Sequence, residues 1–566
     1  MAEKKFKFSG LEYSRPDFDK ARKYLAKYIE NFKVAKSFED ADKLFLAHAK
    51  ENELLETMQT IARIRNTADM NDKFYEAEMN FFNEELPKFA VEESEADKLL
   101  LSSPFRADFE GKYGADMIKN IEAQVKLTDE AIVSEQVEEA KLCQQYSKVA
   151  GCASINFRGE DCNFYGLLKH MESTDRTERR EAFIAWAKLY ESISGELDDI
   201  YTKLVNLHKT MAKKLGFKSY VEMAYLSNGH YYYNAADVAS FRKQVVEEVV
   251  PIAQKLFESQ KKRLGVDKLY YYDEFLCYPE GNATPVGDGK YLIEKAREMY
   301  AEMSKESGEF FDFMVEHELF DFETRTGKHQ GGYCTFLPEY KAPFIFSNFN
   351  GTSADADVLT HEAGHALQAY LSAKQLPLAS QIWATSDICE IHSMSMEHFA
   401  YPYMEKFFGE GAKKYCRAHL AEAVKTVPYL CLVDHFQHEV FANDFTAEER
   451  RACWKRLEKI YLPWRDYDGN EFLEGGGFWM QKQHIFLYPF YYVDYALAQM
   501  GAFEYYARSK RVPEKTWADY LALCRAGGSK GYFELLKTGG LSNPFKEGAV
   551  KKVMQSISAE LDAAKK

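Results

Sequence analysis

The sequence predicts a mostly α-helical protein with a small β element next to its most distinctive motif. Apolar residues recur at three- and four-residue spacing through much of the chain, which is the pattern of amphipathic helices. One short stretch is instead rich in Gly, Pro and aromatic residues. With 566 residues, of which 46% are hydrophobic and 15% aromatic, the chain is long and apolar enough to bury a large core.

Helical spacing fills most of the N-terminal half, and capping residues such as Ser37, Thr128 and Thr174 mark expected helix starts. The expected helices there are 21–32, 41–64, 74–89, 132–149, 197–215 and 239–263. A turn-rich segment, 278–289, interrupts the pattern. Beyond it, helices are expected at 292–319, 409–443, 448–461, 513–525 and 548–564.

The β element is expected between 327 and 352, where few strong helix formers occur. Residues 343–349 read either as an edge strand that pairs with an extended peptide or as an ordinary buried strand. On the first interpretation, Phe346 and Phe349 would contact the substrate.

Charge and composition exclude several classes of protein. The formal net charge of −15 argues against a nucleic-acid partner, because phosphate binding needs a basic surface. The N-terminus lacks an apolar signal core, and no apolar run approaches the roughly twenty residues that span a membrane. The ten cysteines are scattered singly and read as reduced thiols. We therefore expect a cytoplasmic protein, while its oligomeric state is not predicted.

The most informative segment contains His361-Glu362-Ala-Gly-His365, in a stretch that reads as helix. Residues four apart lie on one face of a helix, so the two imidazoles can bind one zinc ion. Glu362 is then placed to act as general base on the attacking water rather than as a ligand. The pattern alone occurs by chance in about a few per cent of chains of this size, so a third ligand is required.

Two known arrangements of the third ligand fail. Gln368 and Leu371 occupy the positions where the extended pattern needs Gly and His, and Thr385 stands about twenty residues after His365, where another class has Glu. Glu390 is the next good candidate, in a segment of helical character. Asp387 and Glu397 are its alternatives.

With these residues, the chain resembles the thimet oligopeptidase / oligoendopeptidase F family of zinc metallopeptidases, and most closely oligoendopeptidase F. The resemblance rests on several segments between about 331 and 544. These are His361-Glu-Ala-Gly-His365 with Glu390-Ile-His-Ser393, Gly331-Gly-Tyr-Cys-Thr335, 343–352, Gly475-Gly-Gly477, His484, Pro489-Phe-Tyr-Tyr-Val-Asp-Tyr495, and Leu535-Leu-Lys-Thr-Gly-Gly540 with Pro544.

The resemblance implies an elongated helical zincin-type peptidase with a deep substrate channel. Residues 1–195 would form one channel wall and residues 196–566 the catalytic region. One Zn²⁺ would be held by His361, His365 and Glu390, and short unfolded peptides would be the substrates.

His484 and two tyrosines, best matched by Tyr488 and Tyr495, would stabilise the oxyanion of the transition state. Tyr491 and Tyr492 would contact the substrate, and Tyr492 is also a candidate for catalysis. The same aromatic run is typical of a packed core helix, so both interpretations stay open.

Two other functions are consistent with these motifs. A zinc carboxypeptidase would need a cation for the terminal carboxylate, and Arg465, Lys482 and Arg511 lie near the aromatic segment in sequence. A non-catalytic helical binding protein could carry a relic motif, although an intact Glu362 argues against it. The second His-rich segment, 434–439, reads as a continuous helix with core histidines.

Overall fold

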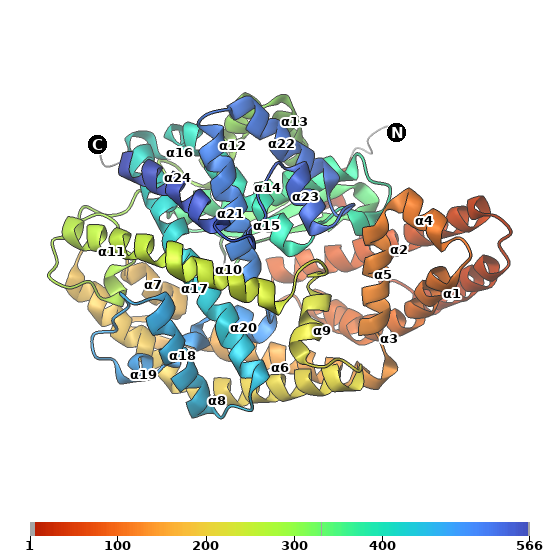
Figure 1. Cartoon of the computed structure of the whole chain (residues 1–566), viewed down its shortest axis with the longest axis horizontal. Helices are drawn as coiled ribbons and strands as arrows, with labels where there is room; N and C mark the ends of the chain where they lie inside the picture. The colour runs from red at the N-terminus through yellow and green to blue at the C-terminus, as the bar shows by residue number, and fades with distance from the viewer. Residues whose placement is uncertain (1–5, 326, 330, 564–566) are drawn as a thin grey trace. The chain divides into compact units, whose positions relative to one another are not determined.

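The computed structural model describes residues 6–325, 327–329 and 331–563, and they are mostly helical, as the sequence predicts (Figure 1). The chain divides into two compact units, each assembled from three separate segments. Unit 1 comprises 1–133, 284–412 and 504–542, and unit 2 comprises 134–283, 413–503 and 543–566. The functional division expected at residue 195 stays a prediction.

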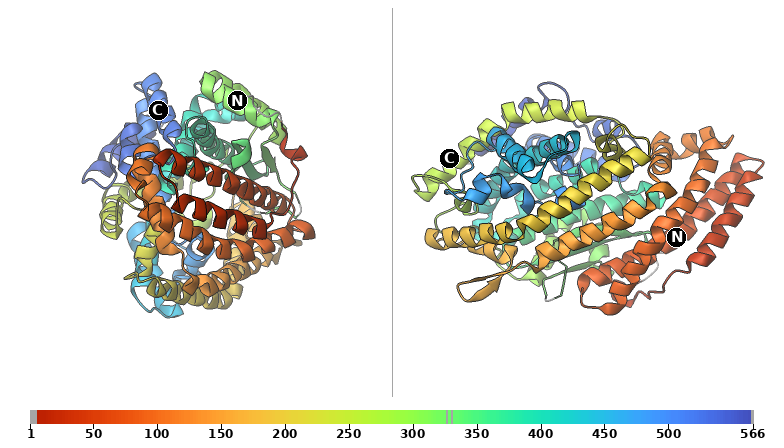
Figure 2. Two further views of the ribbon diagram at one scale, coloured as in Figure 1. Left: turned by 90° about the vertical axis from the view of Figure 1, so that its right-hand side faces the viewer. Right: turned by 90° about the horizontal axis from the view of Figure 1, so that it is seen from below.

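Unit 1 begins with a group of helices that lie side by side (Figure 2). Their shared core is aromatic, and the buried Phe109 ring contacts the rings of Phe38 and Phe45 edge-on. Ser37 caps the second helix, as expected, by accepting a hydrogen bond from the Asp40 backbone N–H. These helices are α1 (Phe18–Lys33), α2 (Phe38–Ala68), α3 (Lys73–Ser102), α4 (Arg106–Tyr113) and α5 (Ala115–Leu127).

A three-stranded sheet follows in unit 1 and confirms the predicted β element. Its order is β3 (Phe320–Glu323), β5 (Ala342–Phe349), β4 (Tyr333–Leu337), with β3 parallel and β4 antiparallel to β5. The edge-strand interpretation of 343–349 is therefore wrong. Strand β5 is central, and seven of its eight residues are buried, so its unbroken apolar run reflects burial on both faces.

Helix α14 (Ala354–Ala373) leaves β5 after a short loop and packs on β4 and β5. Helix α15 (Ser386–Phe399) packs on α14, and so does α22 (Pro513–Ala526). The single helix expected at 292–319 is two helices, because Ser304 caps a new one by accepting from the Ser307 N–H. The remaining helices of this unit are α12 (Gly289–Met303), α13 (Lys305–Glu316), α16 (Glu405–Phe408) and α23 (Tyr532–Thr538).

Unit 2 is helical apart from one hairpin. The helix expected over 239–263 is interrupted at Val249, because Pro251 lacks a backbone N–H and restarts the helix in its first turn. The helices of this unit are α6 (Val133–Cys152), α7 (Phe164–His170), α8 (Arg176–Lys214), α9 (Tyr220–Ser227), α10 (Ala235–Glu248), α11 (Val250–Leu264), α17 (Ala412–Ala442), α18 (Ala447–Tyr461), α19 (Glu471–Glu474), α20 (Gln483–Leu487) and α24 (Ala549–Ala563). Helix α21 (Tyr492–Ser509) begins in unit 2 and ends in unit 1.

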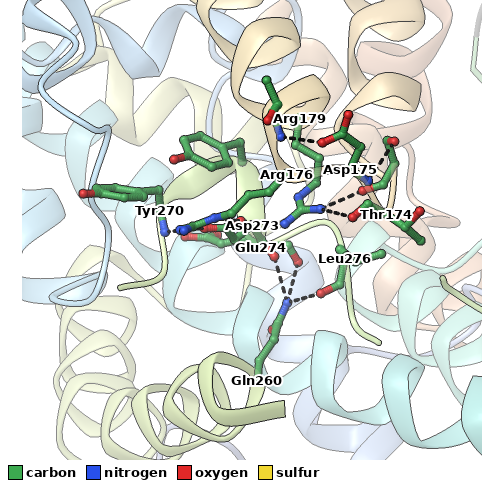
Figure 3. Close-up of polar contacts among 12 residues, drawn as sticks. Thr174, Asp175, Arg176, Arg179, Gln260, Tyr270, Asp273, Glu274 and Leu276 are labelled. Carbon is green, nitrogen blue, oxygen red and sulfur yellow. Dashed lines mark hydrogen bonds and ion pairs between the residues drawn. The ribbon is translucent and has the colours of Figure 1, made fainter. Parts of the chain in front are cut away.

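A buried polar cluster ties the segment after α11 to α8 (Figure 3). The carboxylate of Asp273, which is fully buried, pairs with Arg176 and Arg179 at 2.8 Å each. The side-chain amide of Gln260 donates to three carbonyls of the following turn. These belong to Asp273, Glu274 and Leu276. Such a cluster satisfies buried polar groups within unit 2.

Within the described part of the chain, no helix is long and apolar enough to cross a membrane.

Candidate active site

Helix α14 carries both histidines of the motif on one face. Its start is fixed by Asp355, whose buried carboxylate accepts hydrogen bonds from the backbone N–H groups of Asn350 and Gly351. This contact ties the loop after β5 to the first turn of the helix. The sheet therefore determines where the histidine face of α14 points.

Three potential ligand atoms converge between α14 and α15. One atom each from His361, His365 and Glu390 lies within 4.8 Å of the others. The Oε2 atom of Glu390 is 3.2 Å from Nε2 of His361 and 3.4 Å from Nε2 of His365. The predicted third ligand is thus brought to the two histidines.

These residues fit a zinc ion. Two imidazoles and one carboxylate form a donor set of catalytic zinc sites, and tetrahedral bonds of about 2.0–2.1 Å place neighbouring ligand atoms about 3.3 Å apart. The two observed separations from Glu390, 3.2 and 3.4 Å, match that spacing.

Glu397 contacts one of the potential ligands and does not belong to the group itself. Its Oε1 atom lies 2.6 Å from Nδ1 of His361, which leaves Nε2 facing Glu390. On the other side, the Ser393 hydroxyl donates to Oε2 of Glu390 at 2.8 Å. Partners of this kind fix the direction of metal ligands.

Gly364 explains how α15 comes so close. A Cβ at this position would lie 2.6 Å from the carbonyl oxygen of His392 and 2.7 Å from Cα of Ser393. Real Cβ atoms do not approach backbone that closely, so the two helices could not pack at this distance with any other residue. The glycine inside the motif is therefore a packing requirement.

Glu362 lies beside the backbone that leads into β4. A Cβ on Gly332 would lie 3.5 Å from Oε1 of Glu362, so the backbone before β4 passes directly beside this carboxylate. Burial raises the pKa of Glu362, while His361 and His365 act in the opposite direction. A buried carboxylate of raised pKa next to a metal site suits proton transfer.

The predicted His and Tyr segment forms an aromatic cluster in unit 2. The ring centroid of His484 lies 4.8 Å from that of Tyr492 and 6.1 Å from that of Tyr495. Tyr488 and Tyr491 complete the cluster at 5.9 and 6.1 Å from His484. Tyr488 is 56% exposed, which contradicts the interpretation of the whole run as packed core.

Two contacts from the N-terminal part of unit 2 hold this segment. Nε2 of His230 lies 2.8 Å from Oδ1 of Asp494, and both side chains are fully buried. The Asn228 amide donates to the Pro489 carbonyl at 3.1 Å. Between these anchors, Phe490 adopts a φ of +64°, a strained conformation for a bulky residue.

The triple glycine upstream has a structural role. Gly476, at φ +99°, lies so close to α18 that a Cβ would come within 2.0 Å of the Arg451 carbonyl oxygen. Phe346 and Phe349 are also largely buried, stacked on Tyr333 and Phe322. Their contact with substrate has lost the edge strand that suggested it, and it stays an untested prediction.

Sequence reasoning missed two functional features. The role of Glu397 had a usable signal, since it follows Glu390 by two helical turns and therefore lies on the same face of α15. The pairing of His230 with Asp494 had none, because the two residues are 264 positions apart. The second His-rich segment lies within α17, as predicted, and its histidines, His435 and His438, are half-buried. Their role stays a prediction.

A mostly helical fold with two helix-borne histidines, a glutamate that converges on them and an adjacent buried glutamate defines the class of metallopeptidases. Comparison with known proteins gives the family. The pattern described as "Peptidase family M3" matches residues 169–555, and the "Peptidase M3 N-terminal domain" matches residues 8–128. The chain therefore belongs to peptidase family M3.

Individual relatives agree with this assignment. A crystal structure provisionally named oligoendopeptidase F is 44% identical, with a TM-score of 0.95 and 99% of each chain covered. A structure of PZ peptidase A with an inhibitor is also 44% identical, with a TM-score of 0.95, covering 98% of this chain and 99% of that one. An oligoendopeptidase F homolog from Borreliella burgdorferi is 23% identical over 410 residues, which are 70% of this chain and 67% of the relative. The chain is a metallopeptidase homologous to oligoendopeptidase F.

Proposed function

We propose that this protein is a zinc-dependent endopeptidase that cleaves internal bonds of short, unfolded peptides. The observation that carries the proposal is the convergence of His361, His365 and Glu390 beside the buried carboxylate of Glu362. Relatives named as oligoendopeptidases support peptides as the substrate class.

In this proposal, the chain's own residues move the protons. A zinc ion bound by the three ligands supplies Lewis-acid chemistry and lowers the pKa of water. Glu362 takes a proton from the attacking water and later gives it to the leaving amine. His484 and Tyr495 donate hydrogen bonds to the oxyanion that develops on the scissile carbonyl.

The alternative is a zinc carboxypeptidase, which needs a cation for the substrate's terminal carboxylate. Arg465 does not suit this role, because its guanidinium is paired with Glu274 at 2.9 Å and is largely buried. Lys482 is the better candidate. Its ammonium lies 5.0 Å from the Tyr492 ring centroid, next to the His484 cluster.

The two activities are separated by peptides with different ends. An internally quenched peptide blocked at both termini is incubated with zinc-loaded protein, with a folded protein as a second substrate, and products are identified by mass spectrometry. We expect internal cleavage of the peptide alone. Trimming that begins only when the C-terminus is free would establish the carboxypeptidase instead.

Glu362→Gln is the matched variant, since it keeps the size and polarity of the side chain and removes the base. It should lose nearly all turnover while zinc content, measured by atomic absorption, stays the same. Substantial turnover in this variant would refute the proposed role of Glu362.

A further inference from the structure

A second group of potential metal ligands lies in unit 2, on a hairpin and the helix after it. Strands β1 (Ile155–Phe157) and β2 (Glu160–Cys162) pair in antiparallel register. Arg158 and Gly159, at φ +53° and +91°, form the two-residue turn, as in a type I′ hairpin. Glu160 and Cys162 are two residues apart on one strand, so their side chains share a face.

Helix α7 brings a histidine to that face. Asn163 begins the helix by accepting from the Gly166 N–H at 2.9 Å. A Cβ on Gly166 would lie 3.7 Å from Sγ of Cys162, so the helix passes closely over the thiol. As a result, a carboxylate oxygen of Glu160, Sγ of Cys162 and a ring nitrogen of His170 all lie within 4.8 Å of one another.

The same residues border a cavity of about 670 Å³. Cys162 is 5% exposed, whereas Glu160 is exposed and His170 half-buried, so the thiol forms the floor of the group. Asp161 and Lys169 also line the cavity. The group is therefore open to solvent on one side. A metal ion could reach it after the chain has folded.

His170 is held in the same way as an active-site ligand. Its Nδ1 atom lies 2.7 Å from Oε1 of Glu178, and the Ser173 hydroxyl donates to Oε2 of Glu178 at 2.8 Å. Nδ1 of His361 is held by Glu397 in the corresponding manner. A carboxylate that accepts a hydrogen bond from Nδ1–H keeps the proton on Nδ1. The lone pair of Nε2 is then free to bind a metal, which is the arrangement of metal-binding histidines.

We propose that Glu160, Cys162 and His170 form a second metal site that takes a borderline-soft divalent cation such as Zn²⁺. A thiolate and an imidazole select this class of ion over Mg²⁺ and Ca²⁺, which prefer oxygen ligands alone. On binding, the Cys162 thiol releases its proton to solvent and the sulfur forms the metal bond. The ion would link the hairpin to the end of α7 and so stabilise this part of the fold. Peptide hydrolysis does not require it.

Cobalt distinguishes this site from the active site. Co²⁺ replaces Zn²⁺ readily, and a cobalt–thiolate charge-transfer absorption arises only where a cysteine is a ligand. The active-site donors are two imidazoles and a carboxylate and give no such band. Metal-free full-length protein, titrated with Co²⁺, should take up two equivalents per chain, and the thiolate band should saturate with one of them.

Cys162→Ser should abolish the thiolate band and one equivalent of metal, while the other equivalent and peptide hydrolysis are kept. Cys152→Ser is the matched control, because Cys152 is an exposed thiol on the same cavity and its loss should leave the band intact. His365→Ala should remove the active-site equivalent and keep the band. A band that survives in Cys162→Ser, or no band at full cobalt loading, would overturn the proposal.

Two further variants keep the test valid if Cys162→Ser does not fold. Glu160→Gln alters an exposed side chain. It should weaken Co²⁺ binding to the proposed site, measured by the thiolate band, at least tenfold. Glu178→Gln changes the residue that positions His170 and should weaken Co²⁺ binding about 10–100-fold. Unchanged cobalt affinity in both variants, with unchanged circular dichroism, would also overturn the assignment.

Discussion

At the scale of single residues, the contact between Glu397 and His361 shows how the fold tunes the metal centre. The carboxylate lies 2.6 Å from Nδ1 and so sets both the tautomer and the direction of the ring. We expect Glu397→Gln to lower zinc affinity about 10–100-fold, because the amide is a poorer acceptor for the Nδ1 proton. Competition with a fluorescent chelator measures this affinity.

Glu410→Gln is the control for that experiment, since Glu410 is an exposed carboxylate in a surface turn. Its zinc affinity should equal that of the unmodified protein. Equal affinities in the two variants would show that Glu397 does not support the ligand.

A second residue-scale prediction concerns Tyr495. If its hydroxyl donates to the oxyanion, Tyr495→Phe should reduce kcat about 100-fold and change KM little, since the contact strengthens only in the transition state. Steady-state kinetics with the quenched peptide give both values. Tyr165→Phe, which alters a 60% exposed tyrosine in α7, is the control. A rise in KM at constant kcat would assign Tyr495 to substrate binding instead.

Most of the metal centre could be predicted from sequence, and the reasons are local. His361, Glu362 and His365 follow from helical spacing alone. Glu390 needed the family resemblance to separate it from Asp387 and Glu397, because a ligand from a second helix depends on packing. That packing is set by Gly364, whose close approach to α15 has no sequence signal beyond the residue itself.

At the scale of elements, the contact between α14 and α15 gives a direct test. Gly364→Ala would place a Cβ 2.6 Å from the His392 carbonyl oxygen, so the helices must separate and Glu390 must move from the histidines. We expect loss of bound zinc and a destabilisation of about 1–3 kcal/mol, the usual cost of overpacking. Zinc content and thermal unfolding measure the two effects.

The control for the helix contact is Gly195→Ala. A Cβ at Gly195, an exposed position in α8, meets nothing within 4 Å. This variant should stabilise the protein by about 0.5–1 kcal/mol, because alanine is the better helix former. Zinc retained in Gly364→Ala would contradict the packing argument.

The sequence predicted where helices occur better than it predicted where they are interrupted or how the strands are ordered. The interruption at Val249 follows from Pro251, and the one at Ser304 from a serine cap, so both had local signals. The central place of β5 was not predicted, since the sequence does not show that β3 pairs with β5 on the side opposite β4. The substrate channel implied by the family resemblance stays a prediction.

At the scale of the whole molecule, one half-buried carboxylate, that of Asp97, makes stability depend on pH. Burial, with the nearby charge of Glu93, raises the pKa of Asp97 from 3.8 to about 7, although His48 on α2 acts in the opposite direction. Between these two values, the folded protein binds more protons than the unfolded chain. The free energy of unfolding therefore falls as pH rises through this window and is level above it.

Asp97→Asn removes this dependence, because the amide does not ionise. We expect the variant to be more stable than the parent by up to about 4 kcal/mol at about pH 8 and to show little difference at about pH 4. Urea unfolding at several pH values measures the effect. Asp267→Asn, at an exposed position, is the control, and parallel stability profiles for Asp97→Asn and the parent would refute the prediction.

Because each compact unit is built from three separated segments, the order of synthesis differs from the order of assembly. Helix α22 packs on α14, and the Tyr520 hydroxyl on α22 donates to the His392 carbonyl at 2.9 Å. The ribosome must therefore release residues 504–542, the third segment of unit 1, before the helices that carry His361, His365 and Glu390 acquire their final support. A growing chain thus lacks this support, and with it a finished candidate active site, until almost the whole sequence has been synthesised.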